Sequence, residues 1–526
     1  MNKLIAVMLR FRQEPIAFMS DIEGMFMQVK VHPEDRDCLR FLWWEGGDIT
    51  KQPKTYRMTS HLFGGLWSPS CANFALKRTA EDNKDNFDVK TVQTVDKNFY
   101  VDDCLKSVVS EEEAVRLIKQ LCELLSLGGF RLTKFISNSR RVMMSLPETE
   151  WAKAAASLDL EEECLPAERA LGVLWRVETD QFGYDVSVKD VPSTKRGMLS
   201  FTSTVYDPLG FVGPFIMRAK ILFQELCRQK LDWDEAIPKY VADQWIRWLQ
   251  DLPKIADFKV PRCLKPSDRL EAPVAFQLHH FSNASEKGFG AVTYLRMVDA
   301  SDRIHCCLVM AKSRLAPIKP TTIPRLELSA AVVAVKLDQA CRKHLEYTLP
   351  ESVFWTDSTI VLHYLRSEEK RFQTFVANRV AQIHEGSSSS QWRHVDTNNN
   401  PAYDISRGMS ADEMITDERW TQGPTFLWSK EELWPAQPDL GDIPTAAEIK
   451  KAREIYLTTA TEAKATKTTV DQLFERFSSW HELKQAVAII LRVKDILRKK
   501  SDVNRTEPVT GKEIQRAEQA IIVYMQ

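Results

Sequence analysis

Three aspartates stand at two places within the first 103 residues of this 526-residue chain. Asp21 follows the apolar run Ile16–Met19, and Asp102 and Asp103 follow the run Asn98–Val101. Hard divalent cations such as Mg²⁺ prefer carboxylate oxygens, and two such ions can activate a hydroxyl and neutralise a triphosphate in nucleotidyl transfer. Aspartates also follow strands and occupy turns without any such role. The aspartates alone therefore leave both interpretations open.

The elements around these aspartates favour the catalytic interpretation. Both apolar runs have the length of buried strands, and if the strands pair, the three carboxylates converge. Ser110 and Glu113 form a capping-box pattern that predicts the start of an amphipathic helix, which ends at Gly128-Gly129. Alternation from Phe130 to Ile136 then predicts another strand. Strands and helices in this succession predict an α/β domain.

Four segments of this region resemble reverse-transcriptase motifs, and they occur in the order in which that family has them. They are Phe18–Phe26, Leu62–Pro69, Tyr100–Asp103 and Gly128–Lys134. The resemblance implies an RNA-directed DNA polymerase in which Asp21, Asp102 and Asp103 are the catalytic metal ligands. It also implies two Mg²⁺ or Mn²⁺ ions at each intact site.

The same resemblance implies residues that contact the incoming nucleotide. They are Phe26, Phe63, Gly64, Tyr100 and Lys134. Phe26 stands where the family keeps a bulky residue against the ribose 2′-hydroxyl, and Lys134 would donate a proton to the departing pyrophosphate. The alternative explanation for Phe26 and Phe63 is that they are core aromatic residues, and a lysine on a strand such as Lys134 is usually part of a solvated face.

Further segments resemble the Pao (BEL-type) long-terminal-repeat retrotransposons specifically, and the similarity extends from about residue 5 to past residue 430. These segments are Leu9–Pro15, Phe99–Lys106, Val205–Phe211 and Pro324–Leu328. The resemblance implies a region of a Pol polyprotein. Its partners would be an RNA template with a DNA primer, the RNA–DNA hybrid, and deoxynucleoside triphosphates.

A second group of residues resembles the metal site of an RNase H-like domain, where four carboxylates surround two metals. Glu327, on a helix opened by Pro324, and Asp357, after a strand, match two of the four positions. A solvated helix start and an N-cap are the alternative explanations for these two residues.

The other two positions of that group differ from the family, which has aspartate where this chain has Asn283 and Tyr403. Asp404 is adjacent, but one residue along a helix turns a side chain by about 100°. Since two negative charges are lost, metal affinity and electrostatic stabilisation should both fall. We expect a folded RNase H-like domain with little or no nuclease activity.

Composition excludes several other classes of protein. The chain has 71 Lys and Arg against 72 Asp and Glu, so it lacks the basic excess of many nucleic-acid binders, although a cleft can still be basic locally. Its ten cysteines form no CxxC pair, which excludes a disulfide framework or a zinc cluster of that kind. There is no signal-peptide pattern or membrane-length apolar stretch, so we expect an intracellular protein of the cytoplasm or nucleus with no membrane partner.

The expected fold is a multidomain α/β protein. Residues 1–137 would form a reverse-transcriptase palm with truncated fingers, and residues 138–265 a thumb or connection region. Residues 266–410 would form the RNase H-like α/β domain. Residues 411–526 would be a linker and a helical tail, with a helix over Phe474 to Lys500, leading toward an integrase that is missing.

Two functions from different classes are compatible with the sequence. The first is an RNA-directed DNA polymerase with a degenerate RNase H domain, which the three aspartates favour. The second is a catalytically inactive nucleic-acid-binding or scaffold remnant, favoured by the short segment before Asp21 and by Asn283 and Tyr403. The sequence does not distinguish whether polymerase activity survives, and it does not give template preference or oligomeric state.

Overall fold

The computed structural model describes residues 2–156, 164–186, 192–265, 272–367 and 372–441, and in the C-terminal part residues 473, 476–477, 479–497 and 509–525. The chain divides into two compact units, Met1–Lys450 and Lys451–Gln526. None of the helices in these ranges is long and apolar enough to cross a membrane.

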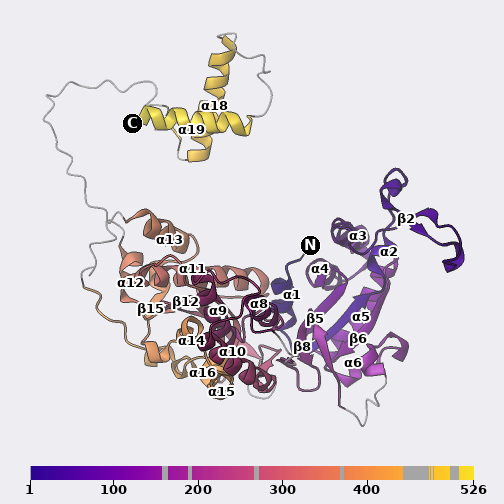
Figure 1. The fold of residues 1–526 in the computed structure, drawn as a ribbon, viewed down its shortest axis with the longest axis horizontal. Coiled ribbons are helices and arrows are strands. Elements are labelled where there is room, and N and C mark those ends of the chain that lie inside the picture. The colour runs from indigo at the N-terminus through magenta and orange to yellow at the C-terminus, as the bar shows by residue number, and fades with distance from the viewer. Residues whose placement is uncertain are drawn as a thin grey trace. The chain divides into compact units, whose positions relative to one another are not determined.

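The N-terminal part of the first unit is built on a four-stranded antiparallel sheet with the strand order β4-β5-β1-β6. The strands are β1 (Ile16–Ile22), β4 (Phe99–Tyr100), β5 (Asp103–Val108) and β6 (Leu132–Ser137). Three helices share a hydrophobic core with this sheet, namely α3 (Ser68–Asp82), α4 (Val89–Lys97) and α5 (Glu111–Ser126) (Figure 1).

Helix α5 begins and ends where its sequence predicts. The Ser110 hydroxyl accepts a hydrogen bond from the Glu113 backbone N–H at 3.2 Å, which satisfies a donor of the first turn. At the other end Gly129 has a φ of +77°, and the Phe130 N–H donates to the Leu125 carbonyl at 3.0 Å. The turn directs the chain back into β6.

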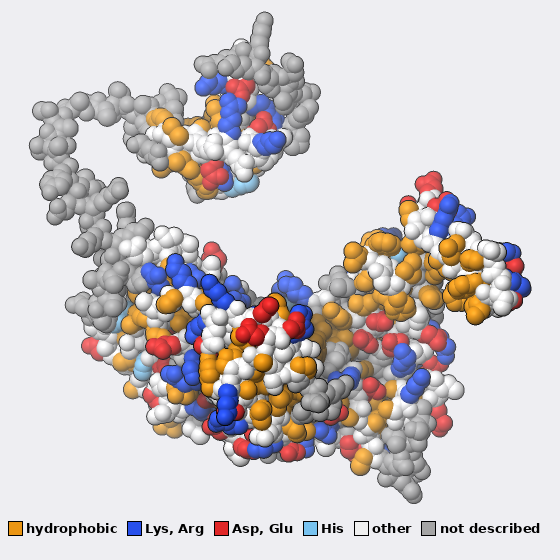
Figure 2. All heavy atoms as spheres, in the orientation of Figure 1, with side chains coloured by type: hydrophobic (Ala, Val, Ile, Leu, Met, Phe, Trp, Pro, Cys, Tyr) orange, Lys and Arg blue, Asp and Glu red, His pale blue; other side chains and the backbone are white. Residues whose placement is uncertain are grey.

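Between β1 and α3 the chain forms a two-stranded hairpin with short helical turns. Its elements are α2 (Met25–Gln28), η1 (Pro33–Leu39), β2 (Arg40–Trp43), η2 (Glu45–Gly47) and β3 (Lys54–Arg57). Aromatic and aliphatic side chains of the hairpin are exposed, as Figure 2 shows near β2. They include Phe41, Leu42, Trp43 and Tyr56.

The middle of the unit contains a second four-stranded sheet and three helices. The sheet has the order β10-β9-β8-β7, with β7 (Ala167–Ala170), β8 (Val173–Arg176), β9 (Gln181–Gly183) and β10 (Val260–Pro261). The helices are α8 (Lys195–Thr202), α9 (Gly213–Arg228) and α10 (Lys239–Asp251), followed by η5 (Leu252–Asp257). Short elements α6 (Arg140–Met144), η4 (Glu148–Glu150) and α7 (Lys153–Ala156) precede them.

A five-stranded sheet with the order β13-β12-β11-β14-β15 forms the rest of the core. Its strands are β11 (Pro273–Ala284), β12 (Gly288–Asp299), β13 (Ile304–Leu315), β14 (Val353–Thr356) and β15 (Trp392–His394). The first three are antiparallel, whereas β14 runs parallel to β11 and to β15.

Helix α11 (Ile323–His344) packs against β11 and β12. Pro324 lies in its first turn, where the missing N–H leaves no hydrogen bond unmade, and Arg342, Lys343 and His344 lie in its last turn, where cations are favoured. Helices α12 (Thr359–Arg366), α13 (Thr374–His384) and α14 (Ala402–Arg407) follow. The order strand, helix, strand, helix for β11, α11, β14 and α14 is the one that the resemblance implies for four metal positions.

Residues 411–441 belong to the first unit and pack against its sheets, although the sequence grouped them with the tail. They form α15 (Ala411–Thr416), α16 (Glu418–Gln422), η8 (Thr425–Trp428) and η9 (Glu431–Leu433). The fully buried Trp420 donates from its indole nitrogen to the Phe211 carbonyl at 2.8 Å. Arg296 of β12 donates to the carbonyls of Leu427 and Ser429 at 2.8 and 3.0 Å. The packing of large aromatic side chains, which periodicity does not reveal, explains this attachment.

Helix α9 likewise packs against β13 and α14. It therefore packs against elements of residues 266–410, which the sequence assigned to a separate domain.

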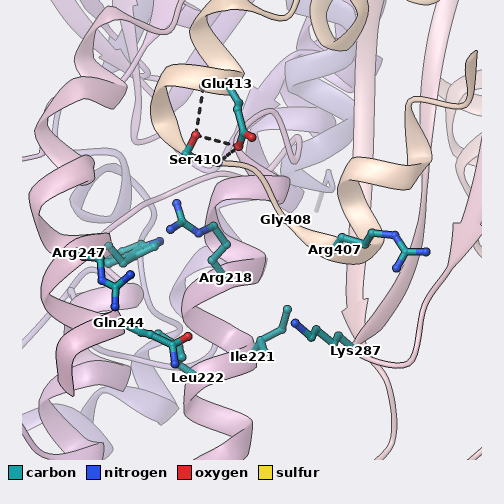
Figure 3. A pocket seen from close by; sticks show the side chains of 11 residues that line it. Arg218, Ile221, Leu222, Gln244, Arg247, Lys287, Arg407, Gly408, Ser410 and Glu413 are labelled. Carbon is teal, nitrogen blue, oxygen red and sulfur yellow. Dashed lines mark hydrogen bonds between the residues drawn. The ribbon is translucent and has the colours of Figure 1, made fainter. Parts of the chain in front are cut away.

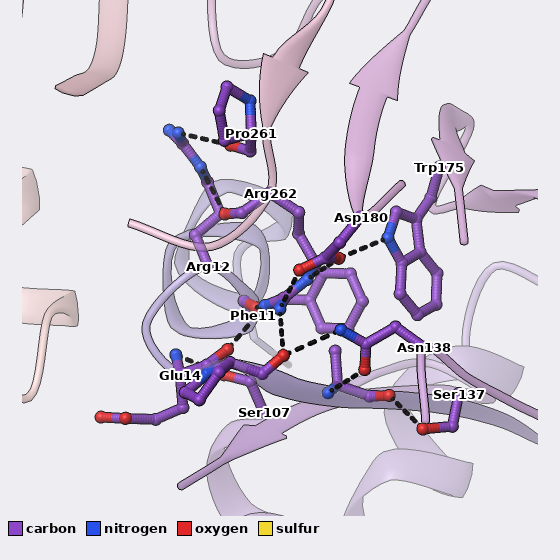
Figure 4. Close-up of polar contacts among 12 residues, drawn as sticks. Phe11, Arg12, Glu14, Ser107, Ser137, Asn138, Trp175, Asp180, Pro261 and Arg262 are labelled. Atoms are coloured by element: carbon purple, nitrogen blue, oxygen red, sulfur yellow. Dashed lines mark hydrogen bonds and ion pairs between the residues drawn. The ribbon is translucent and has the colours of Figure 1, made fainter. Parts of the chain in front are cut away.

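Two buried arginines connect the segment before β1 to the other sheets (Figure 4). Arg12 donates to the carbonyls of Arg262 and Pro261, both at 3.1 Å, and to two carbonyls of β13, those of Leu308 and Val309, at 2.8 and 2.6 Å. The Arg262 guanidinium donates to both carboxylate oxygens of Asp180, at 2.6 and 2.7 Å.

Arg262 also donates to the carbonyls of Phe11, Glu14 and Pro15, at 2.5, 3.0 and 2.8 Å. The two guanidinium groups thus connect three parts of the chain that are distant in sequence: the segment before β1, the strands β9 and β10 with Asp180, and β13.

In the second unit, α18 (Trp480–Leu497) and α19 (Gly511–Met525) pack against each other. Arg492 and Glu513 join them through two hydrogen bonds of 2.7 Å. The helix predicted over residues 474 to 500 contains α18, while residues 474–475, 478 and 498–500 lie outside the described part of the chain.

Candidate functional site

The three aspartates of the N-terminal sheet lie at one end of that sheet. Asp21 of β1 and Asp103 of β5 are directly opposite each other in the antiparallel register. Asp102 lies in the turn between β4 and β5, and its carbonyl accepts a hydrogen bond from the Ile22 N–H at 2.9 Å. Val101, in the same turn, has a φ of +58°. This tight turn brings Asp102 beside the strand that carries Asp21.

The three carboxylates interact electrostatically. Burial, and next the charges of Asp102 and Asp21, raise the pKa of Asp103 to about 7. Burial, and to a smaller extent the charge of Asp21, also raises the pKa of Asp102. Crowded carboxylates with raised pKa values are unfavourable for folding and typical of functional sites.

Lys134 is the cation beside this cluster. Its ammonium group lies 3.0 Å from Oδ1 of Asp21, and the hydrogen bond to Asp21 raises the pKa of the lysine. Lys134 has a φ of +55°, which is uncommon for a residue with a side chain, and its side chain is 57% exposed. The lysine is therefore charged at neutral pH and open to solvent.

Carboxylate oxygens of this kind are the donors that Mg²⁺ prefers, and a divalent cation would relieve their mutual repulsion. Within the part of the chain that the structure describes, no group of three or more His, Cys, Asp or Glu side chains is arranged to hold a metal ion. In donor type and charge, the three aspartates nevertheless fit a divalent metal ion. Their side chains do not form a closed ligand set.

The predicted nucleotide-contacting residues lie partly together. The rings of Phe26 and Phe63 meet edge to face with their centroids 4.9 Å apart. Phe26 is buried, whereas Phe63 is 63% exposed and so is not a core aromatic residue. Gly64 has a φ of +86°, a conformation that glycine adopts without strain. Tyr100 is opposite Asp103 in the β4–β5 pairing.

At the five-stranded sheet, Asn283 and Asp357 lie side by side at the ends of β11 and β14. The Asn283 amide nitrogen donates to both oxygens of Asp357, at 2.9 and 3.1 Å. The Thr397 hydroxyl donates to Asp357 at 2.9 Å, and the Ser406 hydroxyl donates to the Asn283 carbonyl oxygen at 2.7 Å. Neutral donors from Asn283 and Thr397 thereby contact the Asp357 carboxylate.

Glu327 projects from α11 into the same region. Burial, and next the charge of Asp357, raise the pKa of Glu327 to about 9. Its Oε2 atom is buried and has no hydrogen-bond partner among the residues that the structure describes. The side chain is therefore a neutral acid at neutral pH.

The metal position that Tyr403 occupies, the last of the four that the resemblance implies, is not supplied with a carboxylate by the adjacent Asp404. Tyr403 and Asp404 are on α14, and the Arg419 guanidinium donates to Asp404 at 2.7 Å. Burial raises the pKa of Asp404 to about 6. The Arg407 guanidinium lies 4.4 Å from the centre of the Tyr403 ring. Since Asp404 is engaged by α16, it does not replace the missing aspartate beside Asn283.

Sequence reasoning missed three residues of this region: Thr397, Ser406 and Arg419. Each acts on a residue that is between 15 and 123 positions away in the chain. Serine, threonine and arginine are common on surfaces, so no signal in the sequence separated these from others of their type.

Comparison with known proteins gives one match to a family model. Residues 194–358 match the model of the Pao retrotransposon-like RNaseH-like domain, a range that includes Asn283, Glu327 and Asp357. No curated protein matches the chain.

Two solved structures of a foamy viral enzyme are similar to the chain. One is the foamy viral protease-reverse transcriptase dRH in complex with double-stranded DNA, with a TM-score of 0.45, 12% identity, and coverage of 75% of this chain and 59% of that one. The other is the foamy viral protease-reverse transcriptase in complex with an RNA/DNA hybrid, with a TM-score of 0.44, 14% identity, and coverage of 75% and 46%. The chain thus spans about half the length of these relatives.

Proposed function

Given that the chain carries a Pao retrotransposon RNase H-like domain in residues 194–358, we propose that it is the reverse-transcriptase region of a retroelement Pol polyprotein. In this proposal residues 1–137 are the palm with part of the fingers, and their aspartates perform nucleotidyl transfer. The middle region is the thumb or connection. The RNase H-like domain holds an RNA–DNA hybrid without cutting it.

The observation that carries the polymerase proposal is the cross-strand pairing of Asp21 with Asp103, next to Asp102 in the adjoining turn. Three carboxylates at one strand end supply the oxygen donors for divalent cations. When bound, Mg²⁺ or Mn²⁺ would activate the primer hydroxyl and neutralise the triphosphate of the incoming nucleotide. The raised pKa of Asp103 supports this, because the cluster has an energetic need for positive charge.

The residues around the aspartates have separate tasks in this proposal. Lys134 carries a proton on Nζ at neutral pH, as its contact with Asp21 only raises the pKa further, and this proton can pass to the leaving pyrophosphate. The exposed ring of Phe63, supported by the buried ring of Phe26, offers an apolar surface for the nucleotide. Tyr100, opposite Asp103 in the β4–β5 pairing, would contact the incoming nucleotide from β4.

A second function is favoured for the RNase H-like domain, which is binding without cleavage. The amide of Asn283 supplies to Asp357 the partial positive charge that metal ions supply in an active site of this class. Glu327 is protonated and Asp404 is held by Arg419. Asn283 and Tyr403 supply no carboxylate at the other two positions, so two-metal hydrolysis would lack half of the charged ligands that the resemblance implies.

The experiment is primer extension by the purified chain on an RNA template with a DNA primer, deoxynucleotides and Mg²⁺ or Mn²⁺. DNA synthesis by the wild type that is lost in Asp102→Asn supports the polymerase. The control variant is Asp85→Asn, which changes an exposed aspartate of the turn before α4 and should leave synthesis unchanged.

A parallel incubation with a labelled RNA–DNA hybrid tests the second domain. We expect binding without release of RNA fragments. Binding of primer-template without extension would favour the scaffold function for the whole chain, and cleavage that Asp357→Asn abolishes would contradict the binding-only proposal.

A further inference from the structure

A cavity of about 460 Å³ opens between α9, α10, the turn that joins β11 to β12, and the start of α15. Three cationic side chains from different elements surround it: Arg218 of α9, Arg247 of α10 and Lys287 of the turn. Figure 3 shows Lys287 extending toward α9 from one side, with Arg218 and Arg247 on the opposite side. Arg407 is at the rim and points away, over the Tyr403 ring.

The positive charge of this pocket is only partly balanced. Arg218 pairs with Asp251 at 3.1 Å, but Arg247 and Lys287 have no carboxylate within ion-pair distance among the described residues. The one carboxylate in the lining, Glu413, is engaged in a capping box with the backbone N–H and hydroxyl of Ser410, at 2.7 and 2.8 Å. An anion entering the cavity would therefore meet two exposed cations whose charge no carboxylate of the described residues balances.

The shape of the pocket depends on close packing. Gly408 has a φ of +92°, and a Cβ atom there would lie 2.7 Å from Cγ of Arg218 and 3.1 Å from the Pro214 carbonyl oxygen. The chain leaving α14 can pass this close to α9 only because residue 408 is glycine. The wall behind is Trp248, which is buried and stacked on Phe215 with centroids 4.9 Å apart.

The pocket adjoins the Asn283–Asp357 pair through short hydrogen-bonded links. The Ser285 hydroxyl, two residues before Lys287, donates to the Ser406 carbonyl at 2.7 Å. The Ser406 hydroxyl in turn donates to Asn283 at 2.7 Å. Arg407, at the rim, is the next residue of the same helix. Ser285 and Ser406 therefore join the rim of the pocket to the Asn283–Asp357 pair.

We propose that this pocket binds a phosphate group, and that its occupant is a backbone phosphate of a nucleic-acid duplex held by the RNase H-like domain. The proposal rests on the proposed nucleic-acid-binding function and assigns part of the affinity to residues outside the degenerate carboxylate site. Arginine and lysine side chains that converge from three elements suit the two non-bridging oxygens of a backbone phosphate, and each phosphate contact releases counterions from the duplex.

The test compares two double variants of the full chain by fluorescence anisotropy with a labelled RNA–DNA hybrid over a range of salt concentrations. Arg247→Ala/Lys287→Ala removes the unpaired cations of the pocket. Arg116→Ala/Lys119→Ala removes two cations of α5, which lies on the other domain and outside the carboxylate sites. All four side chains are exposed, and a circular-dichroism melt confirms that each variant is folded.

The pocket variant should bind the hybrid about 10-fold more weakly, with a salt slope smaller by about 1 to 2. The α5 variant should bind as the wild type does. Equal affinity and slope for wild type and pocket variant would overturn the inference while leaving hybrid binding itself in place.

A second measurement separates backbone phosphate from a free ion. Inorganic phosphate is titrated against the melting temperature of both proteins. Stabilisation of the wild type but not of the pocket variant supports a phosphate site even if no hybrid is bound, in which case the proposed function fails alone. Absence of any difference in both measurements overturns the pocket as a phosphate site.

Discussion

The amide of Asn283 donates hydrogen bonds to both carboxylate oxygens of Asp357, at 2.9 and 3.1 Å. An aspartate at residue 283 would place two like charges at this distance, and Glu327 would be nearby. The asparagine converts a site that requires cations into one that is satisfied by its own side chains. The residue type at position 283 therefore bears directly on the stability of the fold.

Asn283→Asp should destabilise the chain by about 2–4 kcal/mol in the presence of EDTA, because the carboxylate at the buried position 283 would face the Asp357 carboxylate without a cation between them. Millimolar Mg²⁺ or Mn²⁺ should recover much of the loss. Thermal unfolding with and without metal measures both effects. The matched control is Asn283→Asp/Asp357→Asn, which reverses the amide and carboxylate and should recover stability without metal. If Asn283→Asp is as stable as the wild type in EDTA, the amide is not the substitute for a cation.

Glu327 should make stability depend on pH. Its pKa rises from the ordinary value of 4.5 to about 9 in the folded chain, so the folded state favours the proton. Stability from this group is complete below pH 4.5 and is lost as pH rises toward 9, by up to about 1.4 kcal/mol per pH unit.

Glu327→Gln should therefore gain stability relative to the wild type as pH increases from 5 to 9. Urea unfolding at several pH values measures the difference. Glu286→Gln, at an exposed position in the β11–β12 turn, should show the wild-type dependence. A constant difference between Glu327→Gln and the wild type across this range would show that Glu327 does not carry the proton.

Asp103→Asn should stabilise the chain by about 1–3 kcal/mol at pH 8 and by less near pH 5. The pKa of Asp103 rises from 3.8 to about 7, so burial of the charged form costs stability that accumulates between these values. The same variant should lose primer extension, which is the expected opposition between stability and function. Asp85→Asn serves as control for both readouts, and a loss of stability in Asp103→Asn at pH 8 would contradict the crowded-carboxylate account.

Arg262→Met should destabilise the chain by about 3–5 kcal/mol, because it leaves Asp180 without its ion-pair partner and removes the Arg262 hydrogen bonds to the carbonyls of Phe11, Glu14 and Pro15. Arg262→Lys should recover little of this, since one ammonium cannot replace a planar guanidinium. Denaturant unfolding measures the loss, and Arg228→Met, at the exposed end of α9, should change stability by less than about 0.5 kcal/mol. A small effect of Arg262→Met would mean that the hydrogen bonds and the ion pair of Arg262 drawn in Figure 4 contribute little to stability.

The sequence by itself determined the elements whose signals are local. The capping pair Ser110 and Glu113 marks the start of α5, and the apolar runs before Asp21 and Asp102 form strands, because these features depend on neighbours within a few residues. The order of the four motifs indicated the resemblance to reverse transcriptases and the aspartates to which it assigns metal ions. The match of residues 194–358 to the Pao retrotransposon-like RNaseH-like domain agrees with the resemblance to Pao retrotransposons.

Only the tertiary structure decided what those residues contact. It brought Thr397 and Ser406 to the Asn283–Asp357 pair, turned Asp404 to Arg419, and gathered Arg218, Arg247 and Lys287 around one cavity. Such contacts join residues that are far apart in the chain, and their side chains are of types that occur everywhere on surfaces. Their positions follow from how sheets and helices pack, which no local pattern contains.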